Sequence, residues 1–220
     1  MARDVASEFF VQIDTALDLG AERLRRARLK RLMDVVGAIG LLILFAPLMV
    51  LVALAIRLET AGPALFRQRR TGCDGMPFMI YKFRTMRVVE DGPNVVQALR
   101  DDCRITRVGR FLRRTSVDEL PNLFNVLKGD MSLVGPRPHA LAHDRYYAAA
   151  VPSYVLRFRT RPGITGLAQV TGLRGGTAEV SAMAERVAKD VEYIRDWSLL
   201  LDVQILVRTF GVFAFHPAAY

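Results

Sequence analysis

The sequence predicts an α+β, mainly helical protein in which a re-entrant membrane helix hairpin is fused to a small cytoplasmic α/β head with interfacial amphipathic helices. Three observations predict this fold class. Residues 35–56 form an uncharged run of 22 residues, and at about 1.5 Å per residue such a helix can cross the apolar core of a bilayer. Short apolar runs between Gly and Pro follow it, as is typical of strands. The last third of the chain returns to helical patterns.

The composition excludes two broad classes of protein. Of the 220 residues, 51% are hydrophobic, which excludes a disordered chain, and 24% are charged, which excludes a polytopic helix bundle. Two cysteines exclude a disulfide framework. The net charge of +9 predicts an anionic partner, namely nucleic acid, anionic lipid or a phosphorylated substrate. Next to a membrane segment, basic and aromatic runs such as residues 157–159 favour lipid phosphates, and we expect no nucleic acid.

Residues 1–29 are expected to form a first domain, an N-terminal amphipathic helix. Apolar side chains recur at helical spacing from Val5 through Phe9 and Ile13 to Leu17, and the last turns are basic. A helix of this kind lies at a membrane interface or packs on a partner. The sequence leaves both alternatives open.

Residues 30–57 are expected to form a second domain, the re-entrant membrane helix. Pro47 lies near its middle, has no N–H for the carbonyl group of Ile43, and kinks a helix through its ring. Both flanks of the segment are basic, and basic flanks favour the cytoplasmic side. A helix that bends at Ala46 and Pro47 and leaves on the face where it entered satisfies both flanks. The alternative is a bitopic helix that tolerates the proline.

Residues 58–220 are expected to form the cytoplasmic head with C-terminal helices. Its expected elements are strands over residues 64–66 and 78–81, a helix over 116–128, a loop with short helices over 152–176, and one or two helices over 178–213.

The head holds one segment rich in residues that can do chemistry, residues 113–138. Within it, Ser116 and Glu119 have the spacing of a capping box before an apolar run, and this role alone accounts for both residues. Capping at Ser116 places Asp118 in the first helical turn, where free N–H groups and the helix dipole favour anions.

Further charged residues lie near Asp118 and Glu119 in the sequence, namely Arg113, Asp130 and Arg137. Carboxylates and arginines together suit a divalent cation bound with a phosphate, because Mg²⁺ takes oxygen ligands and bridges phosphoryl oxygens. An ionised Asp beside them could attack phosphorus and form an acyl phosphate. Glu119 could bind the metal or manage a proton, and spacing alone leaves these roles open.

Other chemistry is disfavoured. The chain has no phosphate-binding P-loop and no dinucleotide fingerprint. His139 and His143 stand four residues apart before Asp144, but a zinc site needs a third ligand that the sequence does not make evident.

From Lys30 to its C-terminus the sequence resembles the bacterial sugar transferases, the monotopic polyprenyl-phosphate phosphoglycosyl transferases. The resemblance rests on ordered motifs. They are Lys30-Arg31 with Asp34, a G-P-x-x-F-x-Q-x-R segment from Gly62, K-F-R-[ST]-M from Lys82, R-I-T-R-x-G from Arg104, D-E-L-P from Asp118, G-D-M-S-L-V-G-P-R-P from Gly129 and R-P-G-I-T-G from Arg161. The C-terminal part, with Asp196-Trp197-Ser198-Leu199, resembles enzymes that initiate exopolysaccharide and colanic-acid synthesis.

The resemblance implies a reaction. A hexose 1-phosphate, with glucose or galactose favoured, moves from a UDP-sugar to undecaprenyl phosphate, and UMP is released. Asp118 is implied as the nucleophile that forms a covalent phospho-sugar, which gives ping-pong kinetics. Glu119 is implied as its catalytic partner at a Mg²⁺ site, to which Asp118, Glu119 and Asp130 are the expected ligands. The catalytic head would lie on the cytoplasmic face of the bacterial inner membrane, in contact with its lipids. A homodimer is also possible.

The resemblance and the basic motifs also assign binding residues. We expect substrate phosphates to contact Arg113, Arg137, Lys82, Arg84 and Arg107, and we expect Lys30 and Arg31 to hold lipid headgroups.

Three positions depart from the family pattern. Ala46-Pro47 replaces the usual Ser-Pro at the membrane kink, Ala168 replaces a Trp, and Asp102-Cys103 replaces an Asp-Pro. The departures at Ala168 and at Asp102-Cys103 do not involve the Asp118–Glu119 dyad. The alternative function is a catalytically inactive membrane scaffold of the same fold, and release of UMP from UDP-sugars distinguishes the two.

Overall fold

The computed structural model describes residues 15–87, 102–173 and 179–215. Its α-helices are α2 (Arg28–Glu59), α3 (Arg107–Thr115), α4 (Asn122–Lys128), α5 (Leu141–Ala150), α6 (Leu167–Val170), α7 (Val180–Arg195) and α8 (Leu199–Phe215), and residues 15–26 are also helical. Its 3₁₀ helices are η1 (Cys73–Gly75), η2 (Val117–Glu119) and η3 (Tyr154–Arg159), and its strands are β1 (Leu65–Thr71), β2 (Pro77–Phe83), β3 (Ser132–Val134) and β4 (Gly163–Thr165). The predicted mainly helical α+β class is confirmed.

Two small sheets lie within the head. β1 and β2 form an antiparallel hairpin that pairs Leu65 with Phe83 at one end and Thr71 with Pro77 at the other. β3 and β4 are parallel, with Ser132 opposite Gly163. The hairpin matches the predicted strands, and β4 is a short strand within a stretch predicted to be loop with short helices. The predicted C-terminal helices are α7 and α8.

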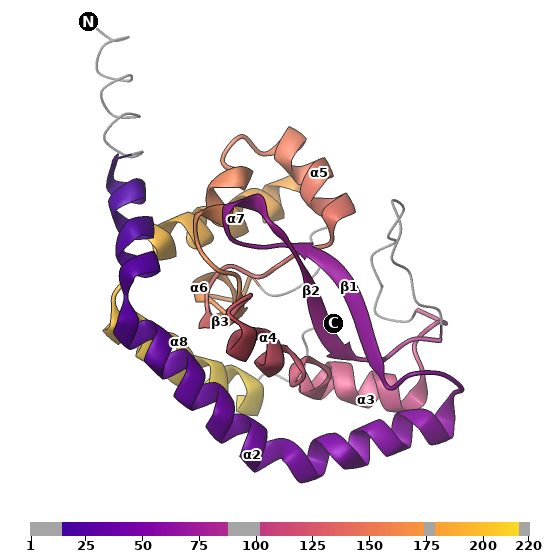
Figure 1. The fold of residues 1–220 in the computed structure, drawn as a ribbon. Helices are drawn as coiled ribbons and strands as arrows, with labels where there is room; N and C mark the ends of the chain where they lie inside the picture. Colours follow the sequence, from indigo (N-terminus) through magenta and orange to yellow (C-terminus); the bar gives the residue numbers. More distant parts are fainter. Residues whose placement is uncertain (1–14, 88–101, 174–178, 216–220) are drawn as a thin grey trace, which may run out of the picture.

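Helix α2 is one continuous helix with Pro47 inside it. Figure 1 shows that α2 bends near its middle, so that its two limbs run along the same side of the head. A proline inside a helix removes one hydrogen bond and its ring pushes the preceding turn aside, which accounts for a bend at this place. The bend agrees with the kink predicted at Ala46 and Pro47.

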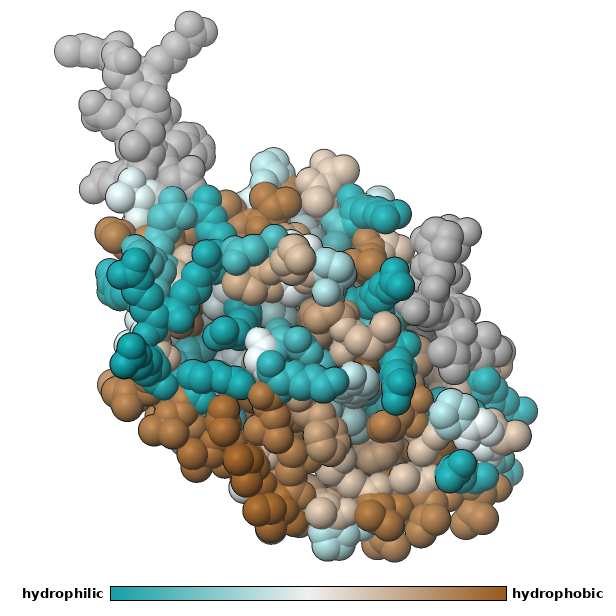
Figure 2. Space-filling model, viewed as in Figure 1, coloured by the Kyte–Doolittle hydropathy of each residue, from teal (hydrophilic) through white to brown (hydrophobic). Residues whose placement is uncertain are grey.

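The outer surface of α2 is apolar. Only 11% of its most hydropathic window is buried, and the helix is long and apolar enough to cross a membrane. Its large exposed side chains include Leu32, Val36, Ile43, Leu51 and Leu54, and α8 adds Leu200, Val207 and Phe210. Together they form an apolar belt along one edge of the molecule, beneath a hydrophilic face (Figure 2). An exposed apolar surface of this extent marks a contact with lipid or protein.

The N-terminal helical segment packs on the head of its own chain. Leu17, Ala21 and Leu24 are buried in the main core with Ile194 of α7. Gly20 permits this contact, because a Cβ there would lie 2.3 Å from the carbonyl oxygen of Ile194. Residues 15–26 therefore use part of their apolar face internally. The first part of the predicted helix over residues 1–29, residues 1–14, lies outside the described residues.

The turn around Ser116 differs from the predicted capping box. Ser116 ends α3 in the left-handed conformation, with φ of 55°, and its side chain caps nothing. The predicted helix over residues 116–128 is instead a 3₁₀ turn, η2, followed by α4. The actual cap at the start of α3 is Thr106, whose side chain accepts a hydrogen bond from the Gly109 N–H at 2.9 Å. Asp118 thus lies in a tight turn between two helices and not in the first turn of an α-helix.

Candidate active site

Glu119 gathers two cations at the turn between α3 and α4. Lys82 of β2 donates a hydrogen bond from Nζ to Oε1 of Glu119 at 2.8 Å. Arg137, which follows β3, donates from Nη2 to Oε1 at 2.6 Å and from Nη1 to Oε2 at 3.2 Å. Three segments distant in the sequence therefore meet at one carboxylate, and a bidentate arginine fixes its orientation.

The two neighbouring carboxylates have opposite electrostatic environments. Burial raises the pKa of Asp118, and Lys82 only partly opposes this. Burial also acts to raise the pKa of Glu119, but Arg137 and Lys82 outweigh it and hold that pKa well below its usual range. Glu119 is therefore ionised and committed to two partners. Asp118 makes no hydrogen bond or ion pair with any other described residue, so its oxygens are available to a ligand.

The structure assembles three of the predicted phosphate-binding residues around the dyad. Lys82 and Arg137 contact Glu119 directly. Arg113, near the end of α3, lies close enough to Asp118 for its charge to oppose the rise in the pKa of that carboxyl. A dyad flanked by three cations attracts a polyanion.

Arg84 and Arg107 have structural surroundings instead of a place at the dyad. The guanidinium group of Arg84 is buried and donates to the carbonyl oxygens of Ala61 at 2.6 Å and Thr60 at 2.9 Å, so it fastens the turn that follows α2. Arg107 is exposed at the start of α3, and its backbone N–H donates to Glu59 at 2.7 Å. The expected role of Arg84 in binding substrate is corrected, because its Nη1 and Nη2 donors are used by Ala61 and Thr60.

The expected lipid-headgroup role of Lys30 is wrong in this structure. Lys30 is 5% exposed, and its Nζ donates to Asp202 of α8 at 2.8 Å and to the carbonyl oxygen of Val134 at 3.1 Å. Arg31 donates to the carbonyl oxygens of Val126 and Leu127, near the end of α4, at 2.6 and 2.9 Å. Both side chains fasten the start of α2 to the head, because burial forces an ammonium group to take charged or polar partners.

Lys30→Met is expected to destabilise the head by about 3–5 kcal/mol, because it leaves Asp202 buried and without its cation. The double variant Lys30→Met, Asp202→Leu should recover most of this loss. Thermal unfolding in nanodiscs measures the stability of both variants. The matched control is Arg28→Met, at an exposed position on the same helix. Its free energy of unfolding is expected to stay within about 0.5 kcal/mol of the wild type. A single variant as stable as the control would contradict this account of the pair.

Asp130 is not part of the dyad. Its Oδ2 accepts a hydrogen bond from Asn125 Nδ2 at 3.2 Å, and the backbone N–H of Asp130 donates to the Asn125 carbonyl group at 3.0 Å. In the part of the chain that the structure describes, no three His, Cys, Asp or Glu side chains gather to hold a metal ion. The expected three-carboxylate site with Asp130 is therefore corrected. Asp118, whose oxygens make no hydrogen bond with the described residues, fits Mg²⁺ of the kind held by one carboxylate together with substrate phosphates, whereas both oxygens of Glu119 already accept from Lys82 or Arg137.

The sequence did not predict that Arg70 lies near the dyad. It lies on the same face of β1 as the buried Gln68, and alternation along the strand is the signal that could have found it. Burial, followed by the charge of Arg137, lowers the pKa of Arg70 to about 10, and the charges of Asp144 and then Glu119 partly oppose this. Arg70 is thus a further cation beside the dyad.

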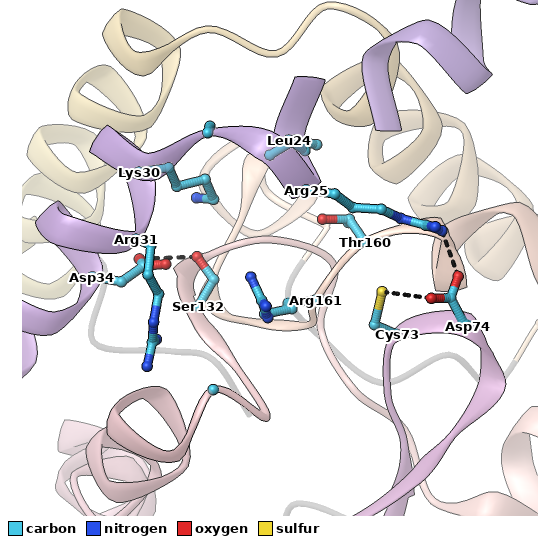
Figure 3. Close-up of a pocket in the computed structure, with 12 residues that line it drawn as sticks. Leu24, Arg25, Lys30, Arg31, Asp34, Cys73, Asp74, Ser132, Thr160 and Arg161 are labelled. Carbon is cyan, nitrogen blue, oxygen red and sulfur yellow. Dashed lines mark hydrogen bonds and ion pairs between the residues drawn. The ribbon is translucent and has the colours of Figure 1, made fainter. Parts of the chain in front are cut away.

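A cavity of about 400 Å³ lies at the start of α2, and neither carboxylate of the dyad lines it. Figure 3 shows Arg161 pointing into it between Ser132 and Cys73. Both Arg25 and Lys30 line it, but each already has an acidic partner, Asp74 and Asp202. The cavity is therefore a polar space separate from the dyad.

Comparisons with known proteins show the family of this chain. The family model described as bacterial sugar transferase matches residues 25–216. The chain is 62% identical over 180 residues to a UDP-glucose:undecaprenyl-phosphate glucose-1-phosphate transferase of Caulobacter vibrioides, covering 82% of the chain and 67% of the relative. It is 48% identical over 207 residues to the Escherichia coli protein of the same name, covering 94% of the chain and 44% of the relative.

A third relative is closer to this chain in length. It is the exopolysaccharide production protein PSS of Rhizobium leguminosarum bv. phaseoli, which is 45% identical over 185 residues, with 82% of the chain and 92% of the relative covered. The chain thus spans less than half of the Escherichia coli relative and nearly all of the Rhizobium one.

Proposed function

The chain belongs to the bacterial sugar transferase family, and from this premise we propose that it is a membrane-bound enzyme that transfers a hexose 1-phosphate from a UDP-sugar to undecaprenyl phosphate and releases UMP. Glucose is the favoured sugar, because the relatives from Caulobacter vibrioides and Escherichia coli are both named for UDP-glucose. The proposal rests on one observation, namely that the two carboxylates of the dyad differ in their hydrogen-bond partners. Glu119 is committed to Lys82 and Arg137, while Asp118 keeps its oxygens for a ligand.

The first chemical step uses Asp118 as the nucleophile. Its carboxylate oxygen attacks the phosphorus that carries the sugar, a phosphorus–oxygen bond to Asp118 forms, and the bond to the bridging oxygen breaks. The electron pair of that bond leaves with UMP, which needs no proton at neutral pH. Lys82, Arg113 and Arg137 screen the charge of the diphosphate, so that an anionic nucleophile can approach it. Mg²⁺ held by Asp118 together with the phosphates would supply further screening of this kind.

The second step regenerates the enzyme. A phosphate oxygen of undecaprenyl phosphate attacks the same phosphorus, a diphosphate bond forms, and the bond to Asp118 breaks with its electron pair returning to the carboxylate. One phosphate pocket then serves a water-soluble donor and a lipid acceptor in turn. This order predicts ping-pong kinetics.

A panel of UDP-sugars tests the proposal. The purified protein in nanodiscs, with undecaprenyl phosphate and Mg²⁺, is expected to release UMP fastest from UDP-glucose, with UDP-galactose and UDP-N-acetylglucosamine as comparisons. Absence of UMP release from every sugar would overturn the proposal in favour of an inactive scaffold. Release of UMP without formation of a lipid-linked sugar would contradict undecaprenyl phosphate as the acceptor.

We further propose that α2 is re-entrant and that both of its ends face the cytoplasm at the inner membrane. The proposal is supported by the bend of α2 at Pro47 (Figure 1), the exposed apolar belt, and the basic residues at both ends of the segment. Basic flanks favour the cytoplasmic side. A single limb of about half the helix is shorter than the roughly 20 residues that a full span needs.

Pro47→Leu is expected to straighten α2 toward a full span and to move one flank across the membrane, because the missing backbone hydrogen bond is restored. Single cysteines at Arg26 and Arg69, in a background without Cys73 and Cys103, report the side of each flank to a membrane-impermeant thiol reagent. In the chain with Pro47 both are expected to label from the cytoplasmic side, and in the Leu variant from opposite sides. Labelling from opposite sides with Pro47 present would contradict the re-entrant topology.

A further inference from the structure

The cavity at the start of α2 has no part in the steps described above, since neither acid of the dyad lines it. Its walls come from four segments that are distant in the sequence, within residues 24–34, 73–74, 129–132 and 160–161. Its volume of about 400 Å³ is in the range of pockets that bind small molecules. Helix α2 starts where the apolar belt meets the hydrophilic face (Figures 1 and 2). The cavity therefore lies at the border between these two surfaces.

Thr160 brings an unpaired hydroxyl group to the wall of this cavity. The residue is only 5% exposed, and its hydroxyl group makes no hydrogen bond with any described residue. A buried hydroxyl group that is left without a partner lowers the stability of the fold. An oxygen atom of a ligand in the cavity would give this hydroxyl group the partner that it lacks.

Arg161 is the second lining residue whose side chain has no partner in the described part of the chain. It points into the cavity between Ser132 and Cys73 (Figure 3). Burial, followed by the charge of Asp74, raises the pKa of the Cys73 thiol, and the charges of Arg25 and then Arg161 partly oppose this. The guanidinium group of Arg161 therefore lies near the thiol with its donors unused. Its planar fork of N–H groups matches two oxygens of a phosphate.

The other three cations of the lining are held by the protein itself. Arg25 is paired with Asp74, and Lys30 is paired with Asp202. Arg31 donates to two backbone carbonyl oxygens near the end of α4. These contacts fix the walls of the cavity and leave ligand binding to the two unpartnered groups.

The lining has one positive charge in excess, counted over the residues that the structure describes. Arg31 and Arg161 line the cavity without an acidic partner. Only one lining carboxylate is left to balance them, that of Asp34, which accepts from the hydroxyl group of Ser132 at 3.0 Å and from the N–H of Leu133 at 2.9 Å. A phosphodiester carries a single negative charge, whereas a phosphate monoester carries about 1.5 to 2 near pH 7. The excess charge therefore fits a phosphodiester.

We propose that this cavity binds a phosphate group, held by the guanidinium group of Arg161 and the hydroxyl group of Thr160. A phosphodiester is the group that joins the head of a phospholipid to its glycerol, and the neighbouring apolar belt offers its acyl chains a surface. A soluble phosphate compound shares the same chemistry, and the test distinguishes the two sources. The inference does not depend on the proposed reaction, because the cavity is separate from the dyad.

Protection of Cys73 from alkylation measures occupancy of the cavity, because this cysteine also lines it. In the full chain with Cys103→Ser, Cys73 is the one remaining cysteine. The protein is kept in micelles of a maltoside detergent, which contains no phosphate, and the alkylation rate is measured as phosphatidylglycerol is added. We expect the rate to fall by the factor 1 + [L]/Kd, which is about elevenfold when the mole fraction of the lipid is about ten times Kd.

Two further compounds identify the group that is recognised and its source. Diacylglycerol has the same acyl chains without a phosphate and is expected to give no protection. Protection by inorganic phosphate, with none by phosphatidylglycerol, would support the phosphate site and assign it to a soluble ligand. Protection by neither phosphate compound, or equal protection by diacylglycerol, would overturn the inference.

Two variants test the proposed contacts. With Arg161→Gln, the Kd of phosphatidylglycerol is expected to rise by roughly tenfold to a hundredfold, as for the loss of a hydrogen bond to a charged group. With Thr160→Val, which keeps the shape of the side chain, we expect a rise of about tenfold. The matched control is Arg145→Gln, at an exposed position on α5 outside the cavity, with a Kd within about twofold of the parent chain. Each variant is compared with and without lipid, so a change in the reactivity of Cys73 cancels.

Thr160→Val also separates a ligand contact from a structural role. In micelles without phosphate, its melting temperature is expected to equal or exceed that of the parent chain, because the variant removes a buried hydroxyl group that has no partner. A residue that only supports the fold would instead lose stability when its hydroxyl group is removed. A lower melting temperature together with an unchanged Kd would therefore contradict the proposal, as would an unchanged Kd in both variants.

Discussion

Asp118→Asn is expected to abolish both turnover and the covalent sugar-phosphate adduct. The amide carries no charge and is a poor nucleophile, so the first bond to phosphorus cannot form. The Asn side chain is nearly the size of Asp, and Asp118 makes no hydrogen bond with the described residues, so the fold should be retained. Intact-protein mass after incubation with UDP-glucose and Mg²⁺, without lipid, measures the adduct, and peptide mapping locates it.

The matched control is Asp196→Asn, a change of the same kind at an exposed residue that pairs with its neighbour Arg195. This control is expected to form the adduct and to turn over at the wild-type rate. An active Asp118→Asn enzyme would contradict the proposed mechanism. So would kinetics that require the lipid to be bound before UMP is released, because a covalent intermediate on Asp118 allows UMP to leave first.

Glu119→Gln is expected to lower kcat by about 100- to 1000-fold, the size of effect seen when one preorganised electrostatic contact is lost. The substitution removes the charge that Lys82 and Arg137 share. A glutamine offers one acceptor oxygen in place of two and presents an N–H₂ group to one of the cations, so Arg137 loses its bidentate contact. We expect the cations to shift and the donor phosphate to bind in a less reactive position.

Steady-state kinetics with UDP-glucose measure this effect, and Glu192→Gln is the matched control. Glu192 is partly exposed and pairs with Lys189 within one helix, where such a pair contributes little. The control should retain wild-type kcat. A Glu119→Gln enzyme within threefold of the wild type would show that the dyad needs only the carboxylate of Asp118.

Several elements could be predicted because their cause is local. An uncharged run of 22 residues requires a helix in contact with apolar surroundings, and a proline inside it bends that helix wherever it lies. The hairpin of β1 and β2 follows from two short apolar runs around glycines, and α7 and α8 follow from apolar residues at helical spacing. These signals depend on near neighbours in the chain, which a sequence displays directly.

The capping box at Ser116 shows where local signals mislead. Its spacing suits the start of a helix, but Ser116 closes the preceding helix in a left-handed conformation. Pro121 follows within the same few residues, and a proline has no N–H to extend a regular helix through its position. The residue types alone drew attention to Asp118 and Glu119, but they did not predict the tight turn on which the two residues lie.

The sequence by itself determined the long apolar helix, its bend, the family motifs and the neighbouring acids Asp118 and Glu119, because each depends on residue type and on spacing along the chain. The tertiary structure decided which charges are partners. It buried Lys30 against Asp202, used Arg84 to fasten a turn, left Asp130 with Asn125, and brought Arg70 and Arg157 beside Arg137. The physical reason is that the strength of an ion pair depends on the distance between two groups and on their exclusion from water, and folding sets both through contacts between segments that are distant in the sequence.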